Sequence, residues 1–308
     1  MPTISVVVPL YNEEETFGEL LERLTTVLSG VKYQYEVIFI NDGSTDKTAE
    51  LLDRALEKNS SLRAVHFSRN FGHQSAVTAG IDHATGDAVL VMDADLQDPP
   101  ELIPDFIKKY EEGFDVVYAV RGTRKESIIK RLSYYLFYRL ITRMTPEVSL
   151  PHDAGDFALI GRNVADVLRG LPERNRYVRG LRAWSGFKQT GIRYERQERF
   201  AGQSKYSYWK LFKLAYDGIF SFSYMPLLLV TMLGFLFSVV AFIGIFVVLY
   251  FKLFGEKDIP GFASIAIFVL CLGGAQLLAL GVVGEYIRRI YDETKQRPTY
   301  IISKKKGF

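Results

Sequence analysis

Two aspartates one residue apart, Asp93 and Asp95, are the side chains of this sequence whose type and spacing point most directly to chemistry. With Gln97 they belong to the pentapeptide Asp-Ala-Asp-Leu-Gln. Carboxylate and amide oxygens are hard ligands that suit Mg2+ or Mn2+, and a metal held there could bind a nucleotide diphosphate. Asp-x-Asp pairs also occur in ordinary solvated turns, so the motif alone leaves both interpretations open.

The segments around the two aspartates predict the elements that must position them. The apolar run 88–92, rich in residues that favour strands, directly precedes Asp93 and is predicted to be a buried strand. Further strands are expected at 4–10, 36–40, 63–68 and 116–120. Strands that alternate with helical patterns predict an α/β fold with a mostly parallel sheet. Such sheets bind ligands at the carboxyl ends of their strands, which is where the two aspartates stand.

Two long apolar segments raise the hydrophobic fraction of the 308-residue chain to 48%. The segments 225–251 and 262–283 each exceed the roughly 20 residues that cross a hydrocarbon core. Buried helices of a soluble protein would keep a polar face, and these segments largely lack one. We therefore expect two transmembrane helices, at about 225–251 and 262–287.

The distribution of charge predicts how the chain is oriented in the membrane. The net charge of +3 is too small to favour a nucleic-acid partner. The connection 252–260 carries two lysines and two acids, whereas the segment 288–308 is basic. The positive-inside rule then places this tail and the N-terminal domain in the cytoplasm, at the plasma or inner membrane. The single cysteine fits a reducing compartment.

Between the sheet and the membrane lie two stretches, 130–143 and 206–222, that are both basic and aromatic. We expect interfacial helices at the headgroup layer there; ordinary core aromatics with solvated lysines are the alternative. Glycines at 273, 274, 281 and 284 permit close helix contact, so a homo-oligomer is also expected. The predicted organisation is a catalytic domain at 1–195, an interfacial segment at 196–224, a transmembrane hairpin at 225–287 and a basic cytoplasmic tail at 288–308.

Several loop motifs resemble those of family 2 glycosyltransferases of the GT-A fold, and they occur in the same order. The matching segments are 8–13, 41–44, 93–100 and 155–157. The sequence Arg-Phe-Ala-Gly-Gln-Ser-Lys-Tyr at 199–206 resembles the Arg-x-x-Gly-x-Ser-Lys-Tyr of the dolichol-phosphate mannose synthase-like group. The segment 284–298 is similar to that of two-helix members, which include the bacterial bactoprenol glucosyltransferases. The resemblance covers nearly the whole chain and implies a Rossmann-like GT-A catalytic domain.

This resemblance implies a sugar nucleotide donor, a divalent metal and a role for particular residues. The residues expected at the donor nucleotide are Pro9, Tyr11, Glu13, Asp42, Asp93 and Ala94. Tyr11 offers a stacking face for the base, and Glu13 offers acceptors for ribose hydroxyls; a capped helix start is the alternative for this loop. Asp93, Asp95 and Gln97 would hold Mg2+ or Mn2+, with Asp95 the best candidate for a direct ligand.

The acceptor that the resemblance implies is a polyprenyl phosphate, which arrives at the site already charged. Its second pKa is about 6, so it can attack the anomeric carbon without losing a proton, and a general base is less necessary. Cations are needed to bring two anionic groups together. The residues expected to bind this phosphate are Arg121, Arg124, Lys130, Arg131, Ser133, Arg199 and Lys205. A solvated basic face attracted to anionic lipid is the alternative.

Asp156 matches the position to which the family usually gives the catalytic base, and with Asp93 and Asp95 it completes the expected catalytic set. It could orient the acceptor, bind a sugar hydroxyl or take a proton; a structural cap in the 153–157 turn is the alternative. The expected activity is metal-dependent, inverting transfer of a hexose to the lipid phosphate. UDP-glucose is the favoured donor, while GDP-mannose and modified UDP-sugars remain open.

Two rival functions fit the sequence less well. A processive polysaccharide synthase typically carries Gln-x-x-Arg-Trp and more membrane spans, and this sequence has no such motif. A membrane scaffold with a degenerate transferase domain is disfavoured, because Asp93, Asp95 and Asp156 are intact.

Overall fold

The computed structural model describes residues 2–122, 154–195, 220, 223–254 and 261–308. Those residues contain an eight-stranded sheet of order β7-β5-β6-β4-β1-β2-β3-β8. The strands are β1 (Thr3–Leu10), β2 (Gln34–Asn41), β3 (Leu62–Phe67), β4 (Ala88–Val91), β5 (Val116–Arg121), β6 (Ala154–Gly161), β7 (Gln189–Tyr194) and β8 (Ile302–Lys306). Four of the seven strand pairings are parallel, and the predicted α/β fold with a mostly parallel sheet is confirmed.

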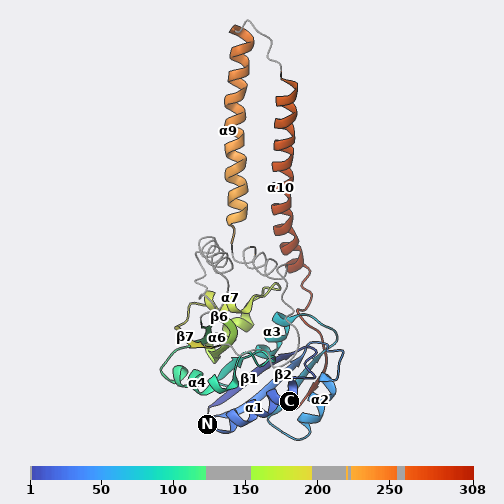
Figure 1. Cartoon of the computed structure of the whole chain (residues 1–308), viewed down its shortest axis with the longest axis vertical. Helices are drawn as coiled ribbons and strands as arrows, with labels where there is room; N and C mark the ends of the chain where they lie inside the picture. The colour runs from blue at the N-terminus through green and yellow to red at the C-terminus, as the bar shows by residue number, and fades with distance from the viewer. Residues whose placement is uncertain (1, 123–153, 196–219, 221–222, 255–260) are drawn as a thin grey trace.

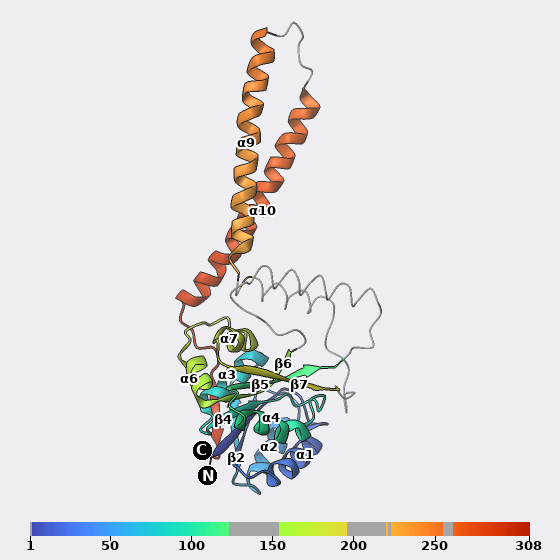
Figure 2. The same ribbon diagram turned by 90° about the vertical axis from the view of Figure 1, so that its left-hand side faces the viewer.

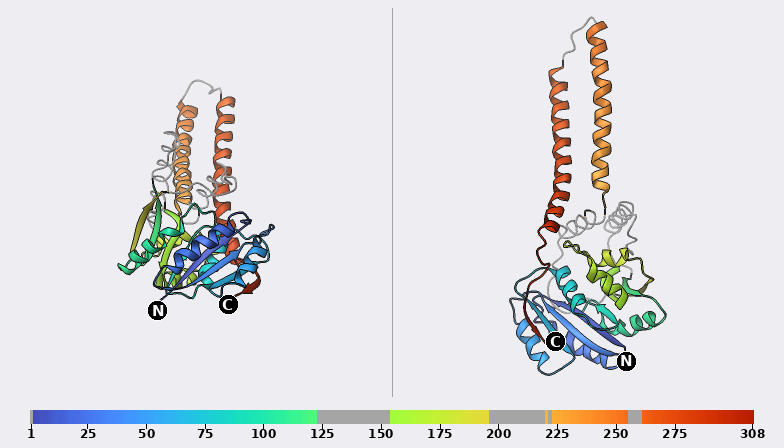
Figure 3. Two further views of the ribbon diagram at one scale, coloured as in Figure 1. Left: turned by 60° about the horizontal axis from the view of Figure 1, so that its bottom comes forward. Right: turned by 180° about the vertical axis from the view of Figure 1, so that it is seen from behind.

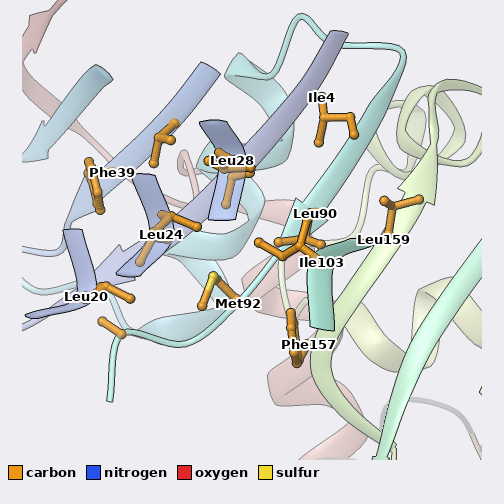
Figure 4. Close-up of a cluster of buried hydrophobic side chains, with 14 of the residues drawn as sticks. Ile4, Leu20, Leu24, Leu28, Phe39, Leu90, Met92, Ile103, Phe157 and Leu159 are labelled. Carbon is orange, nitrogen blue, oxygen red and sulfur yellow. The ribbon is translucent and has the colours of Figure 1, made fainter. Parts of the chain in front are cut away.

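Helices cover both faces of this sheet because its central strands are apolar on both sides. Along β1, Val6 and Val8 pack into one buried cluster and Val7 into the other. The first cluster contains side chains of α1 (Phe17–Ser29), α2 (Thr48–Leu56) and α4 (Ile103–Glu111), which follows the short 3-10 turn η1 (Pro100–Leu102). The second contains side chains of α3 (His73–His83), α6 (Arg162–Gly170) and α7 (Val178–Trp184). Figure 4 shows leucines of α1 in the first cluster, facing Phe39 and Met92.

Helix α3 packs closely on the sheet at Gly80. A Cβ placed on Gly80 would lie 2.0 Å from Cγ1 of Val7 in β1. Val7 is fully buried in the packed core, so it has little room to move away from an added side chain. The absence of a side chain at Gly80 therefore allows α3 to pack this closely on β1.

Replacing Gly80 with alanine is expected to destabilise the protein by about 1–3 kcal/mol, the usual cost of overpacking a core. Thermal unfolding of the full chain in detergent would measure this loss. Gly18→Ala in α1 is the matched control, because nothing lies within 4 Å of a Cβ at that position. Equal melting temperatures for Gly80→Ala and Gly18→Ala would contradict the prediction that a methyl group added at Gly80 overpacks the core.

A pair of long helices, α9 (Met225–Phe254) and α10 (Phe262–Thr294), projects from one end of the α/β domain, away from the two termini (Figures 1 and 2). Met225–Phe251 and Ile267–Thr294 are long and apolar enough to cross a membrane, by length and composition. Their large apolar side chains are exposed along both helices, as expected of lipid-facing surfaces. The helix of α10 continues past residue 287, the predicted end of the span, into a charged segment.

The segment predicted as a basic tail, 288–308, is tied to the domain. Its first residues complete α10, and β8 pairs antiparallel with β3 at the edge of the sheet (Figure 3). Nζ of Lys304 and of Lys306 lie 3.1 and 2.6 Å from Oδ2 of Asp53 in α2. Because β3 and β8 belong to one sheet, the N-terminal domain and the C-terminus must lie on the same side of any bilayer that α9 and α10 cross. The predicted interfacial stretches 130–143 and 206–222 lie outside the described residues, except for Phe220.

Candidate active site

The turn after β4 presents the Asp93 to Gln97 motif with a regular alternation of burial. Ala94 and Leu96 are buried in the core, whereas Asp93, Asp95 and Gln97 are partly exposed. Leu96 has a φ of 57°, and the backbone N–H of Gln97 donates to Oδ1 of Asp95 at 3.2 Å. The two apolar side chains thus anchor the turn, and the three predicted metal ligands lie on its outer side.

The oxygens of Asp93, Asp95 and Gln97 fit a divalent cation whose remaining ligands come from a substrate. No cluster of three or more His, Cys, Asp or Glu side chains with metal-ligand geometry occurs among the described residues. Oδ1 of Asp93 is buried, and no donor in the described part of the chain makes a hydrogen bond to it. Mg2+ is commonly held by one or two carboxylates together with substrate phosphates, and this donor set suits that arrangement. The metal site itself stays a prediction.

His73, the first residue of α3, lies between two of the predicted catalytic carboxylates. Its Nε2 is 3.6 Å from Oδ1 of Asp93 and 3.4 Å from Oδ2 of Asp156. Partial burial lowers the pKa of His73, but the charges of Asp93 and Asp156 outweigh it and raise that pKa to about 9. The imidazole is therefore a cation at neutral pH and joins the end of β4 to β6.

The position of His73 depends on Asp42, which the sequence places at the donor nucleotide. The two oxygens of Asp42 accept the backbone N–H groups of Phe71 and Gly72 at 2.6 and 2.9 Å. Gly72 has a φ of 99°, a conformation that side chains rarely adopt, immediately before the helix begins. Asp42 thus holds the loop that delivers His73, and its contact with a nucleotide stays a prediction.

Burial acts to raise the pKa of both Asp93 and Asp156, but the net shifts are opposite because their charged neighbours differ. Burial and the neighbouring carboxylates of Asp98, Asp156 and Asp95 raise the pKa of Asp93 to about 6, although His73 opposes the shift. Burial also acts to raise the pKa of Asp156, but His73 and two arginines hold it well below its usual range. Asp156 therefore remains ionised, whereas positive charge added near Asp93 would favour the ionised form of that carboxyl group.

The two arginines near Asp156 belong to α7. Arg182 is only 4% exposed, and its Nη2 donates to the carbonyl oxygen of Gly155 at 3.3 Å. Its guanidinium lies 5.7 Å from the ring centroid of Tyr118. Burial lowers the pKa of Arg182 to about 10, so it keeps its charge at neutral pH. Arg179 precedes Arg182 by about one turn of the same helix, and its guanidinium lies 4.7 Å from the ring centroid of Tyr177. Positive charge thus gathers on the β6 side of the site.

A cavity of about 870 Å3 is lined by α2, β3, β8 and the loops after β2 and β3, together with Tyr11 of the loop after β1. Residues from all three loops line it, among them Tyr11, Gly43, Ser44, Arg69 and Asn70. Tyr11 is 39% exposed. A cavity at the carboxyl ends of these strands suits a nucleotide, as the sequence predicts.

The other residues predicted for the donor have mainly structural surroundings. Pro9 is paired with Ile40 across β1 and β2. The backbone N–H of Glu13 donates to Oγ1 of Thr48 at 2.8 Å, and Oγ1 of Thr16 donates to Oε2 of Glu13 at 2.8 Å. These contacts hold Glu13 against Thr48 of α2 and against Thr16, although α1 itself begins without a side-chain cap. A role of Glu13 at the donor stays a prediction.

Most of the residues predicted for the acceptor phosphate lie outside the described residues. They are Arg124, Lys130, Arg131, Ser133, Arg199 and Lys205. The backbone of Arg121 ends β5, in register with Tyr194 of β7. The described cations near Asp156 are instead His73, Arg179 and Arg182, none of which the sequence pattern singles out. For His73 one signal was available: it follows a predicted strand at the edge of the sheet that binds ligands.

Comparisons with known proteins find similar sequences over nearly the whole chain. The family model for glycosyl transferase family 2 matches residues 5–169. A Bacillus subtilis (strain 168) protein named uncharacterized glycosyltransferase YkcC is 49% identical over 304 residues, covering 98% of this chain and 94% of that protein. The bactoprenol glucosyl transferase of Shigella phage SfV is 40% identical over 306 residues, covering 98% of this chain and 99% of that protein. The prophage bactoprenol glucosyl transferase homolog of Escherichia coli (strain K12) is 40% identical over 305 residues, with the same coverage. The similarity therefore includes the C-terminal helices as well as the sheet.

Proposed function

Because this chain belongs to glycosyltransferase family 2, we propose that it transfers glucose from a sugar nucleotide, UDP-glucose in the first instance, to a polyprenyl phosphate. The GT-A fold expected of such a member is confirmed. The lipid acceptor is supported by the relatives named bactoprenol glucosyl transferase, which match this chain nearly from end to end. The observation that carries the proposal is that His73 lies between the carboxylates of Asp93 and Asp156, at 3.6 and 3.4 Å.

In the proposed reaction, the Asp93 side and the Asp156 side of His73 receive two different anions. Asp93 and Asp95 face the leaving nucleoside diphosphate, and a bound Mg2+ or Mn2+ would neutralise the charge that develops there. The charges of Arg179 and Arg182 attract the acceptor phosphate toward Asp156. A phosphate oxygen forms the new bond to the anomeric carbon while the bond from that carbon to the diphosphate oxygen breaks, with inversion.

Asp156 acts in this scheme as a fixed negative charge. Its pKa is held well below the usual range, so it is a weak base. The acceptor needs none, because a phosphate monoester with a second pKa of about 6 is largely dianionic at neutral pH. Asp156 instead keeps His73 and the α7 arginines in place around the anomeric carbon.

The membrane explains why the domain carries a hairpin. A polyprenyl tail stays in the bilayer, so the site must be held at the headgroup layer. We place the domain and β8 in the cytoplasm with two spans between them, as the positive-inside rule favours. The exposed apolar side chains of α9 and α10 would contact lipid, and a homo-oligomer stays a prediction.

Purified full-length protein, undecaprenyl phosphate and a panel of labelled sugar nucleotides would test the proposal. UDP-glucose with Mg2+ is expected to give a labelled product that extracts into organic solvent, and EDTA is expected to abolish it. Transfer from GDP-mannose or another UDP-sugar would reassign the donor. A labelled polymer, or no lipid product with any donor, would overturn the proposed function.

A further inference from the structure

The charged end of α10 is attached to the loop that precedes α7. The carboxylate of Glu293 accepts the backbone N–H of Arg174 at 2.8 Å through Oε1 and at 3.1 Å through Oε2. Oε1 also accepts the backbone N–H of Asn175 at 3.3 Å. In return, Nη1 of Arg174 donates to the carbonyl oxygen of Arg297 at 2.6 Å. Contacts therefore run in both directions between the membrane helix and this loop.

The loop is itself held against the rest of the α/β domain. Nη2 of Arg176 donates to the carbonyl oxygen of Leu168 at 3.0 Å, and its Nε donates to that of Glu173 at 3.1 Å. The backbone N–H of Val178 donates to Oε1 of Gln74 at 2.8 Å. Gln74 is the neighbour of His73, so α7 is aligned directly with the start of α3. A displacement of the loop would then move α7 relative to the site.

Helix α7 carries the two arginines that lie near Asp156. It lies at the end of the domain that faces the hairpin (Figure 2). Arg179 follows Arg174 by only five positions, which leaves little slack in the connection. The contacts of Glu293 therefore connect the charged end of α10 to the helix that carries these cations.

We propose that Glu293 is a positioning residue, which aligns the arginines of α7 with the depth at which the membrane presents the acceptor phosphate. The inference rests on the proposed function, because it assigns α7 to the acceptor. A carboxylate suits this task, since a charge-assisted hydrogen bond is shorter and stronger than a neutral one. Two successive backbone donors also fix its direction, which a surface ion pair does not.

The proposal predicts a defect that depends on the acceptor. In lipid nanodiscs, Glu293→Ala is expected to raise KM for undecaprenyl phosphate about tenfold, because the hydrogen bonds that its charged carboxylate accepts are lost. KM for the sugar nucleotide should not change. With geranyl phosphate in detergent, variant and wild type should be alike, because a short soluble acceptor does not need a fixed depth. Glu293→Gln keeps one oxygen acceptor and should recover part of the loss.

Asp292→Ala is the matched control, because Asp292 precedes Glu293 and pairs with Arg288 of its own helix at 3.1 Å. It should behave as wild type with both acceptors. Equal losses with the long and the short acceptor, or a raised KM for the donor, would show a general structural role and overturn the proposal. A wild-type protein inactive with every acceptor would instead reject the proposed function.

Hydrogen–deuterium exchange tests the attachment without any activity. In nanodiscs, the amides of Arg174 and Asn175 and of the following helix α7 should exchange faster in Glu293→Ala than in wild type, and Asp292→Ala should leave them unchanged. Unaltered exchange across 171–184 in Glu293→Ala would overturn the proposal whatever the activity.

Discussion

Asp95→Asn is expected to lower turnover by about a thousandfold, because stabilisation of a leaving diphosphate by a metal is worth several kcal/mol and each 1.4 kcal/mol or so is tenfold. Asparagine has the shape of aspartate and keeps an oxygen for the N–H of Gln97, so the turn should persist. The apolar anchors Ala94 and Leu96 are untouched by the change. Initial rates over a range of Mg2+ concentrations would measure the loss.

Asp105→Asn is the matched control for this variant, because Asp105 is an exposed acid in α4, outside the site. It should have wild-type rates, and thermal unfolding should show that both variants are folded. Near-normal turnover in Asp95→Asn would remove Asp95 from the metal site and leave Asp93 as its remaining carboxylate.

Asp156→Asn is expected to lower turnover about a hundredfold, the scale of a misplacement of reacting groups by about 1 Å. The loss should not become smaller as the pH rises from about 6.5 to 8, because the low pKa of Asp156 keeps it ionised there. The acidic limb of the profile should follow the acceptor phosphate, whose second pKa is about 6, in both proteins. A pH profile of kcat/KM for the acceptor checks this.

The basic limb of the same profile shows in which direction Asp156 shifts the pKa of His73. The two carboxylates raise the pKa of His73 to about 9, so removing one of them must lower it. If the cationic form of His73 is the active one, the basic limb of Asp156→Asn moves to lower pH. Recovery of the rate on simply raising the pH would instead assign Asp156 a proton-accepting role. Asp166→Asn in α6, an exposed acid paired with Arg169, is the control.

The parts of the fold that the sequence predicts are those with a strong local pattern. The five expected strands and both apolar helices are present, because long apolar runs have few alternatives to burial or insertion. The strand β6 was missed since glycine and Asp156 interrupt its apolar residues. The strand β8 was interpreted as a basic tail, yet lysines are common on edge strands, where they prevent pairing with other chains.

The candidate site was predictable only in part, for a different reason. Asp93 and Asp95 are neighbours in the sequence and form a motif, whereas His73 meets them only because α3, β4 and β6 converge. Arg179 and Arg182 likewise act from a short helix that follows the core strands. A single histidine or arginine has no spacing to recognise, so tertiary contacts of this kind become visible only in three dimensions.

The pairing of β8 with β3 also dictates the order in which the protein can be completed. Ser303 and the carbonyl oxygen of Phe67 that it contacts are separated by 236 positions, with both long helices between them. During synthesis the N-terminal strands emerge first, and the edge of β3 stays unpaired until β8, which follows both long helices, has been made. An unpaired edge is a template for aggregation. The closing strand therefore covers this edge only after both long helices have been synthesised.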